Sequence, residues 1–270
     1  MPLALATLGL PGLPLDRAAG LAAEYGWHGL ELRCADDQPV RLGMDADERR
    51  AAARLLSRAG VVPLTLASYV GVAAPGPDAP VLAGLTAHLR LAADLGCRHL
   101  RVFPHGGPGP VAEADGRAVR RLRRAAPQAA ALGVRILVET HDSHRAGAAL
   151  APLLREVDHP AVGALWDLLH TWLAGETPAQ THRALGPHLG YAQVKDVASA
   201  DDLTPLPLGA GVLPIADCLR LLPPGAWAAW EYEAPWHPNA APLAPRLGPG
   251  ARYLSALRPR RALLPDQGRR

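Results

Sequence analysis

The chain has 270 residues, of which 49% are hydrophobic and 20% are charged. A chain of this length can bury a large core, and it suits either one barrel-sized domain or two ordinary ones. The net charge is +3, and the basic residues are almost all arginines on amphipathic stretches, without interleaved aromatic residues. This pattern excludes a nucleic-acid-binding surface as the chain's main function.

The cysteines and the first residues indicate where the protein works. Cys34, Cys97 and Cys218 lie far apart without CxxC spacing, which argues against a disulfide framework or a structural zinc site. The first segment, "MPLALATLGLPGLPLD", has no basic region and contains three prolines, which argues against a signal peptide or a membrane anchor. We therefore expect a cytoplasmic enzyme with free thiols and no membrane partner.

Short apolar runs recur along the chain and predict β-strands. They cover residues 3–9, 29–34, 62–69, 99–106, 134–141, 162–170, 190–197 and 226–233. Stretches with helical periodicity lie between most of them, at residues 15–26, 45–60, 80–96 and 116–133, and each ends on a glycine. Eight such units without a linker predict one (β/α)8 TIM barrel over residues 1–258, and we expect an arginine-rich flexible tail over residues 259–270. The alternative, an open doubly wound sheet, is expected to have a GxGxxG loop after the first strand, and "TLGLPGLPLD" lacks that spacing.

Polar residues end the last four predicted strands, where a barrel builds its active site. These residues are Glu139, Asp167, Gln193 and Glu231. Alternation along the strands points the carboxylates into the barrel, where they would repel one another. A bound divalent cation usually compensates such repulsion. Oxygen ligands favour Mn²⁺, with Mg²⁺ or Co²⁺ as alternatives. Each acid, taken alone, could instead cap the following helix or pair with an arginine.

Several motifs resemble one family. They are "HGLELR" (His28 to Arg33), "VETHD" (Val138 to Asp142), "WDLLH" (Trp166 to His170), "QVKD" (Gln193 to Asp196) and "WEYEAPWHP" (Trp230 to Pro238). Together they resemble the sugar phosphate isomerases/epimerases, which are xylose isomerase-like barrels of the AP endonuclease family 2 superfamily. That superfamily also includes ketose 3-epimerases, inosose dehydratases and the endonuclease IV type of DNA-repair enzyme. The resemblance covers essentially the whole chain, and its most specific parts are the Asp-x-x-His motif and the "WEYE…WHP" segment.

The resemblance implies a metal site with one departure from the family pattern. Glu139, Asp167 and Glu231 match three metal ligands of the family, whereas Gln193 stands where the family usually has a histidine. The amide oxygen of Gln193 can still coordinate a metal, but it lacks the proton chemistry of an imidazole. His170 matches the family's substrate-contacting histidine.

The reaction that we expect is isomerisation or epimerisation of a sugar or sugar phosphate through a metal-stabilised enediolate. The resemblance to related epimerases makes Glu139 and Glu231 the expected pair of proton-transfer residues. The same enediolate could expel a β-hydroxyl group, as a dehydratase or lyase does, and a barrel that only binds a sugar-like ligand is a further alternative. Function as a DNA-repair enzyme of the endonuclease IV type is the weakest alternative. Such an enzyme needs additional histidines for a trinuclear zinc site, and the first four strand ends offer only His105.

Other polar residues are candidates for contacts with a small, sugar-like substrate. Besides His170, these substrate-binding candidates are His141, Lys195, Glu31, Arg33 and His105, and Glu233 competes with Glu231 as a ligand. Backbone amides at Gly209 and Gly211 could grip a phosphate, but two glycines are weak evidence. We expect no nucleic-acid partner, and a homo-oligomer is compatible with the sequence.

Overall fold

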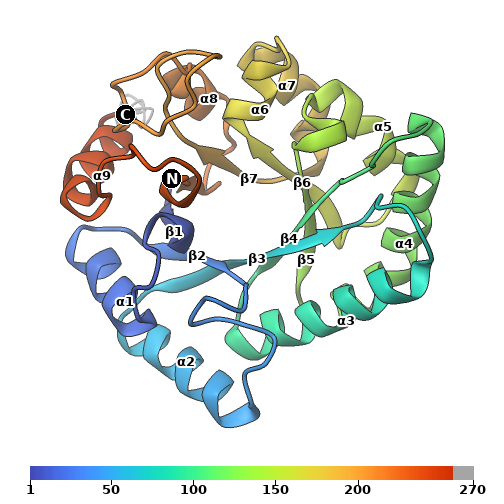
Figure 1. Cartoon of the computed structure of the whole chain (residues 1–270), viewed down its shortest axis with the longest axis horizontal. Helices are drawn as coiled ribbons and strands as arrows, with labels where there is room; N and C mark the ends of the chain where they lie inside the picture. Colours follow the sequence, from blue (N-terminus) through green and yellow to red (C-terminus); the bar gives the residue numbers. More distant parts are fainter. Residues whose placement is uncertain (258–270) are drawn as a thin grey trace, which may run out of the picture.

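Residues 1–257 are described by a computed structural model and form a closed barrel of parallel strands in the order β1 to β8 (Figure 1). The (β/α)8 barrel expected from the sequence is confirmed. The strands are β1 (Leu3–Ala6), β2 (Gly29–Arg33), β3 (Val62–Gly71), β4 (His99–Phe103), β5 (Arg135–Glu139), β6 (Val162–Asp167), β7 (Leu189–Val194) and β8 (Ala228–Trp230). Pairing of β8 with β1 closes the barrel. The expected tail over residues 259–270 lies outside the described residues.

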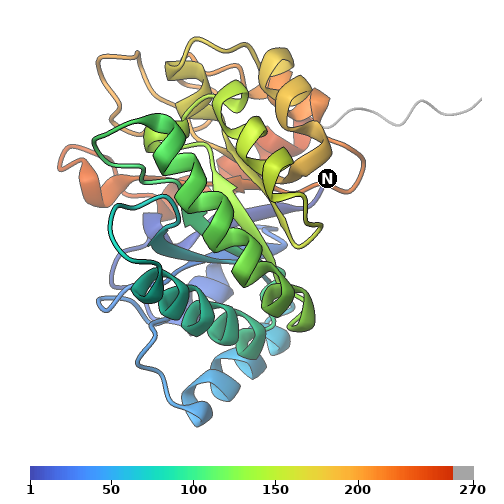
Figure 2. The same cartoon turned by 90° about the vertical axis from the view of Figure 1, so that its right-hand side faces the viewer.

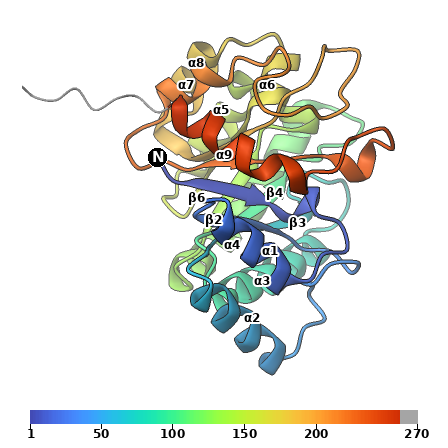
Figure 3. The same cartoon turned by 90° about the vertical axis from the view of Figure 1, so that its left-hand side faces the viewer.

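Helices surround the strands (Figure 1). They are α1 (Leu15–Glu24), α2 (Ala46–Arg58), α3 (Asp78–Leu95), α4 (Val111–Ala131), α5 (Gly147–Val157), α6 (Leu168–Leu173), α7 (Pro178–Leu185), α8 (Ile215–Leu221) and α9 (Leu247–Ala256). On one flank α3 and α4 pack side by side (Figure 2). On the opposite flank α9 lies near β1 (Figure 3) and packs on Trp230 of β8, where Gly250 leaves no room for a side chain.

Local sequence signals explain where the helices begin and end. Asp45 caps α2, because its side chain accepts from the Glu48 backbone N–H at 2.8 Å while the Glu48 carboxylate accepts from the Asp45 N–H at 2.8 Å. The glycines expected to end the first four helices all have left-handed backbone angles. Their φ values are 79° at Gly26, 67° at Gly60, 76° at Gly96 and 67° at Gly133.

The apolar core has two parts, and the inner part positions the functional site. One part fills the space between strands and helices, and the other lies inside the barrel. The inner part consists of Ala4, Leu64, Leu137, Leu165, Tyr191, Trp227 and Ala229. Side chains two residues further along a strand point to the same side, so Glu139, Asp167, Gln193 and Glu231 form the next layer, directly above the inner core.

The cysteines and the helices bear on what the composition predicts. The thiols of Cys34, Cys97 and Cys218 are free and buried. Within residues 1–257, the helices are too short or too polar to cross a lipid bilayer.

His99 gives the barrel a testable dependence on pH. Its ring stacks on Tyr191 with centroids 5.7 Å apart, and its Nδ1 is buried without a hydrogen-bond partner among the described residues. Burial, helped by the charges of Arg135 and Arg98, lowers the pKa of His99 to about 4. A histidine in the unfolded chain has a pKa near 6.5, so below that pH the unfolded state binds a proton that the folded state excludes. The folded state therefore has its full stability above pH 6.5 and loses stability as the pH falls toward 4.

We therefore predict that the free energy of unfolding falls by about 2–3 kcal/mol between pH 6.5 and pH 4.5 through His99 alone. Urea unfolding of the wild type, of His99→Phe and of the control His182→Phe on α7 measures this change. His99→Phe should flatten the pH dependence by that amount, and the control should keep the wild-type slope. A His99→Phe variant with the wild-type slope would contradict the assignment.

Candidate functional site

A cavity of about 300 Å³ opens at the carboxyl ends of the strands. Its polar wall includes the expected residues Glu139 and Glu231, which come from β5 and the end of β8. The other lining residues are Leu8, Tyr69, Arg101, Phe103, His105, His141, Asp142, Glu233 and Trp236. The position agrees with the rule that barrel enzymes build their sites at this end.

Lys195 is the only lysine of the chain and contacts Glu231 and Glu233, two acids that line this cavity. Its Nζ lies 2.7 Å from Asp167 Oδ2, 2.5 Å from Glu231 Oε2 and 2.6 Å from Glu233 Oε1. The ammonium group is buried, and burial lowers its pKa, but the charges of Asp167, Glu231 and Glu233 outweigh burial and raise the pKa well above its usual value. Lys195 is therefore a permanent positive charge between the ends of β6, β7 and β8.

Gln193 lies beside Lys195 and is held by two carboxylates. Its Nε2 donates to Glu31 Oε1 at 2.6 Å and to Glu231 Oε1 at 3.3 Å. The amide oxygen is buried without a hydrogen-bond partner among the described residues. The Tyr191 hydroxyl donates to the other oxygen of Glu31. Burial and the nearby charge of Glu231 raise the pKa of Glu31 to about 7.

Arg101 on β4 belongs to the site, although the sequence reasoning did not select it. The residue is 3% exposed, its guanidinium lies 4.1 Å from the centroid of the Phe103 ring, and Nε lies 3.2 Å from Glu139 Oε2. Burial raises the pKa of Glu139 well above its usual value, although Arg101 opposes this shift. The available signal was an arginine inside the apolar run "HLRVF", two residues from Phe103 and on the same face.

Asp167 has two roles at the end of β6. One oxygen caps α6, because Oδ1 accepts from the backbone N–H of Leu169 at 2.8 Å and of His170 at 3.3 Å, and the other contacts Lys195. Burial favours the protonated form of Asp167, but Lys195 outweighs burial and lowers the pKa. The capping role that any strand-end acid could have is therefore present here together with the ion pair.

Glu139, His141 and His170 converge at the inner wall. Each offers a ligand atom, and these atoms lie within 4.8 Å of one another. The two imidazole rings meet edge to face, with centroids 4.1 Å apart, and Nε2 of His170 is buried without a hydrogen-bond partner among the described residues. Burial lowers the pKa of His170 to about 4, so the imidazole is neutral at pH 7, as metal coordination requires. The residues therefore fit a divalent cation.

Two further substrate candidates lie at the rim. The His105 side chain is 63% exposed, and its Nδ1 lies 3.2 Å from Asp142 Oδ2. Arg33 turns toward Asp37, with Nη1 at 3.0 Å from the carboxylate, and donates from Nε to the Tyr69 hydroxyl at 2.7 Å. Arg33 also lies 5.7 Å from the centroid of the Trp236 ring, so it borders the cavity through Tyr69 and Trp236, and a substrate contact by Arg33 stays a prediction.

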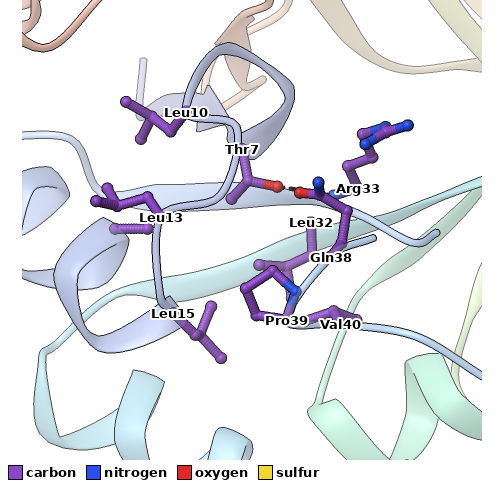
Figure 4. A pocket seen from close by; sticks show the side chains of 10 residues that line it. Thr7, Leu10, Leu13, Leu15, Leu32, Arg33, Gln38, Pro39 and Val40 are labelled. Atoms are coloured by element: carbon purple, nitrogen blue, oxygen red, sulfur yellow. Dashed lines mark hydrogen bonds between the residues drawn. The ribbon is translucent and has the colours of Figure 1, made fainter. Parts of the chain in front are cut away.

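A second hollow near Arg33 is part of the packing of the barrel. Leu10, Leu13, Leu15, Pro39 and Val40 surround it (Figure 4). Its volume of about 10 Å³ is at most enough for one water molecule. This hollow is therefore too small for an organic ligand, unlike the cavity of about 300 Å³ that Glu139 and Glu231 line.

Comparison with known proteins agrees with this geometry. A family model described as a xylose isomerase-like TIM barrel matches residues 19–256. The chain belongs to the xylose isomerase-like TIM barrel family. The family resemblance inferred from the sequence motifs is confirmed.

Relatives of this xylose isomerase-like barrel include enzymes of different reaction types. The 3-dehydroshikimate dehydratase of Bacillus anthracis is 32% identical over 87 residues, which are 32% of this chain and 31% of that protein. The solved structure of the IOLI protein with a bound zinc atom has a TM-score of 0.79 at 15% identity and covers 95% of this chain and 99% of that one. D-allulose 3-epimerase from Methylomonas sp. has a TM-score of 0.76 at 17% identity and covers 95% and 98%. At these identities, the solved structures show a shared fold.

Asp196 fixes the loop between β7 and α8 in this xylose isomerase-like barrel. The buried carboxylate accepts from the backbone N–H of Gly209 at 2.8 Å, of Gly211 at 2.9 Å, of Leu213 at 3.2 Å and of Val197 at 3.2 Å. A side chain at Gly211 would collide with this carboxylate. The two glycine amides that could have gripped a phosphate are therefore used by Asp196.

We predict that Asp196→Ala lowers the free energy of unfolding by about 2–4 kcal/mol, because it leaves four backbone N–H groups without their acceptor. Asp201→Ala, an exposed acid in the same loop, is the matched control and should stay within about 0.5 kcal/mol of the wild type. Chemical unfolding of the three proteins at pH 7 measures both values. Equal stability of Asp196→Ala and the control would refute the anchoring role.

Proposed function

We propose that this xylose isomerase-like barrel is a divalent-metal-dependent isomerase or epimerase of a small, sugar-like molecule. The observation that carries the proposal is the pair Glu139 and Glu231, which approach one cavity from different strands beside two histidines. A cavity of about 300 Å³ is at the small end of ligand pockets and suits a monosaccharide-sized molecule.

Glu231 is the proposed base. Lys195 contacts one of its oxygens at 2.5 Å and Gln193 donates to the other at 3.3 Å, so the carboxylate is fixed in position at the cavity wall. A positioned carboxylate can remove a proton from a carbon next to a carbonyl group of the substrate. Glu139 faces the same cavity and is the second proposed proton-transfer residue.

A divalent ion, when bound, would polarise the substrate carbonyl and stabilise the enediolate. Glu139 belongs to every ligand set that the site offers, together with either Asp167, Gln193 and Glu231 or the two histidines. The oxygen-rich first set favours Mn²⁺, with Mg²⁺ and Co²⁺ as alternatives. His141, which lines the cavity, and His170, which lies against it, are placed to contact substrate hydroxyl groups.

The surroundings of the reaction form part of the same proposal. We place the enzyme in the cytoplasm, because its three thiols are free, and we expect a sugar-like substrate. The proposal includes a homo-oligomer, which size-exclusion chromatography with light scattering checks.

A dehydratase is the second candidate. The relative that supports it is the Bacillus anthracis 3-dehydroshikimate dehydratase, through the 87-residue segment at 32% identity. Both reactions begin with removal of a proton next to a carbonyl, and they differ in whether the proton returns or a hydroxyl group leaves.

We predict that the metal-loaded protein exchanges a carbon-bound hydrogen of its substrate for deuterium in D₂O. The test incubates the Mn²⁺-loaded protein with a panel of aldoses, ketoses and 3-dehydroshikimate and follows the reaction by NMR. Exchange with a change of configuration or carbonyl position supports the isomerase or epimerase, and loss of water supports the dehydratase. Glu231→Gln should lower the rate by about 10²–10⁴-fold, because it removes the base.

The matched control is Glu113→Gln, which alters an exposed acid in the first turn of α4, outside the lining of the cavity. We expect this variant to keep most of the exchange rate. Binding of a sugar without exchange in any metal-loaded sample would contradict the enzymatic proposal and would leave a sugar-binding barrel.

A further inference from the structure

We propose that the divalent ion of this cavity is held by Glu139, His141 and His170, and that the Lys195 ammonium takes the place of a metal between Asp167 and Glu231. This inference takes from the proposed function only the presence of a divalent ion. It assigns to this chain a ligand set of one carboxylate and two imidazoles in place of the four strand-end residues expected from the sequence.

Lys195 occupies the position between Asp167 and Glu231. Its Nζ contacts Asp167 Oδ2 at 2.7 Å and Glu231 Oε2 at 2.5 Å, which are two of the four oxygens that the expected ligand set would supply. A divalent ion bonded to the same oxygens would lie next to a buried ammonium group, and the two cations would repel each other strongly. Ion binding at the four strand ends would therefore require Lys195 to leave three carboxylates at once.

Gln193 is fixed on the same side of the cavity as Lys195. Both contacts of its Nε2 are with carboxylates, those of Glu31 and Glu231, which fixes the orientation of the amide. The family position of a ligand imidazole thus holds a neutral amide. Its oxygen is buried without a hydrogen-bond partner among residues 1–257, but an amide oxygen is a poorer ligand than an imidazole nitrogen for Zn²⁺ or Co²⁺.

The three proposed ligands lie on the other side of Glu139. Their ligand atoms are within 4.8 Å of one another, and ligands bound at about 2.0–2.2 Å from zinc lie about 3.4 Å apart, so small side-chain rotations would complete the site. Arg101 contacts Oε2 of Glu139, which leaves Oε1 for the ion. Nε2 of His170 is buried and has no hydrogen-bond partner among residues 1–257.

Neighbouring groups support His141 as a ligand. Asp142 Oδ1 lies 2.8 Å from His141 Nδ1 and places a negative charge beside the imidazole, whose Nδ1 makes no hydrogen bond among the described residues. The Phe103 ring packs against the imidazole with centroids 4.5 Å apart and restricts its rotation. Two imidazoles and one carboxylate favour Zn²⁺, Co²⁺ or Fe²⁺ over Mg²⁺.

The test compares metal affinity in matched variants, without any measurement of turnover. Zn²⁺ affinity is measured by competition with a chelating dye, and Co²⁺ binding by its visible absorption. We predict at least a 100-fold loss of affinity in His141→Ala and in His170→Ala, and less than a threefold change in Gln193→Ala. Glu139→Gln should lose binding under either ligand set and serves as the positive control.

The opposite pattern overturns the inference. If Gln193→Ala and Asp167→Asn lose the metal while the histidine variants keep it, the four strand-end residues are the ligands and the proposed metal-dependent function stands. If the wild type binds neither Zn²⁺ nor Co²⁺, the inference fails, and the metal dependence fails with it if Mn²⁺ does not bind either.

A second measurement needs no variant. Because Lys195 is the only lysine, protein labelled with ¹⁵N-lysine has one side-chain ammonium signal. We expect this signal to stay visible and protected from exchange with water after Zn²⁺ is added. Its loss on metal binding would show that the ion displaces Lys195 and would contradict the proposed ligands.

Discussion

The contact of one buried ammonium group with three carboxylates organises the functional end of this barrel. Strand ends at β6, β7 and β8 bring Asp167, Glu231 and Glu233 within 2.7 Å of Lys195 Nζ. Without a cation at this point, the acids would repel one another in a region that excludes water, and breaking a buried ion pair by removing one partner is strongly destabilising. Lys195 therefore supplies from the chain itself a charge that a bound metal could otherwise supply.

Arg101 has a similar relation to Glu139 on the other wall, and the two cations divide the acids into two groups. Lys195 compensates the charges of Asp167 and Glu231. The charge of Glu139 is compensated by one contact with Arg101 at 3.2 Å, and Glu139 lies next to two histidines. Burial then raises the pKa of Glu139, while Lys195 lowers the pKa of Asp167. We therefore expect an added divalent ion on the Glu139 side, where one cation contacts the acid and two histidines lie beside it.

Much of the fold followed from local patterns, because period-two and period-3.6 alternation and the glycines at helix ends are properties of neighbouring residues. The same alternation predicted correctly that Glu139 and Glu231 point into the barrel. The contacts of Lys195, Arg101 and Glu31 could not be predicted in this way, because closure of the barrel brings β2 and β4 opposite β7. Alternation gives the direction of a side chain but not the distance to one that lies 160 residues away, as between Glu31 and Tyr191.

Anomalous diffraction from crystals soaked in Zn²⁺ tests the central claim most directly, since it locates the ion without reference to activity. The account predicts a peak about 2.0–2.2 Å from ligand atoms of Glu139, His141 and His170, with Lys195 still in contact with Asp167 and Glu231. A peak between Asp167, Gln193 and Glu231, with Lys195 turned away from them, would contradict it.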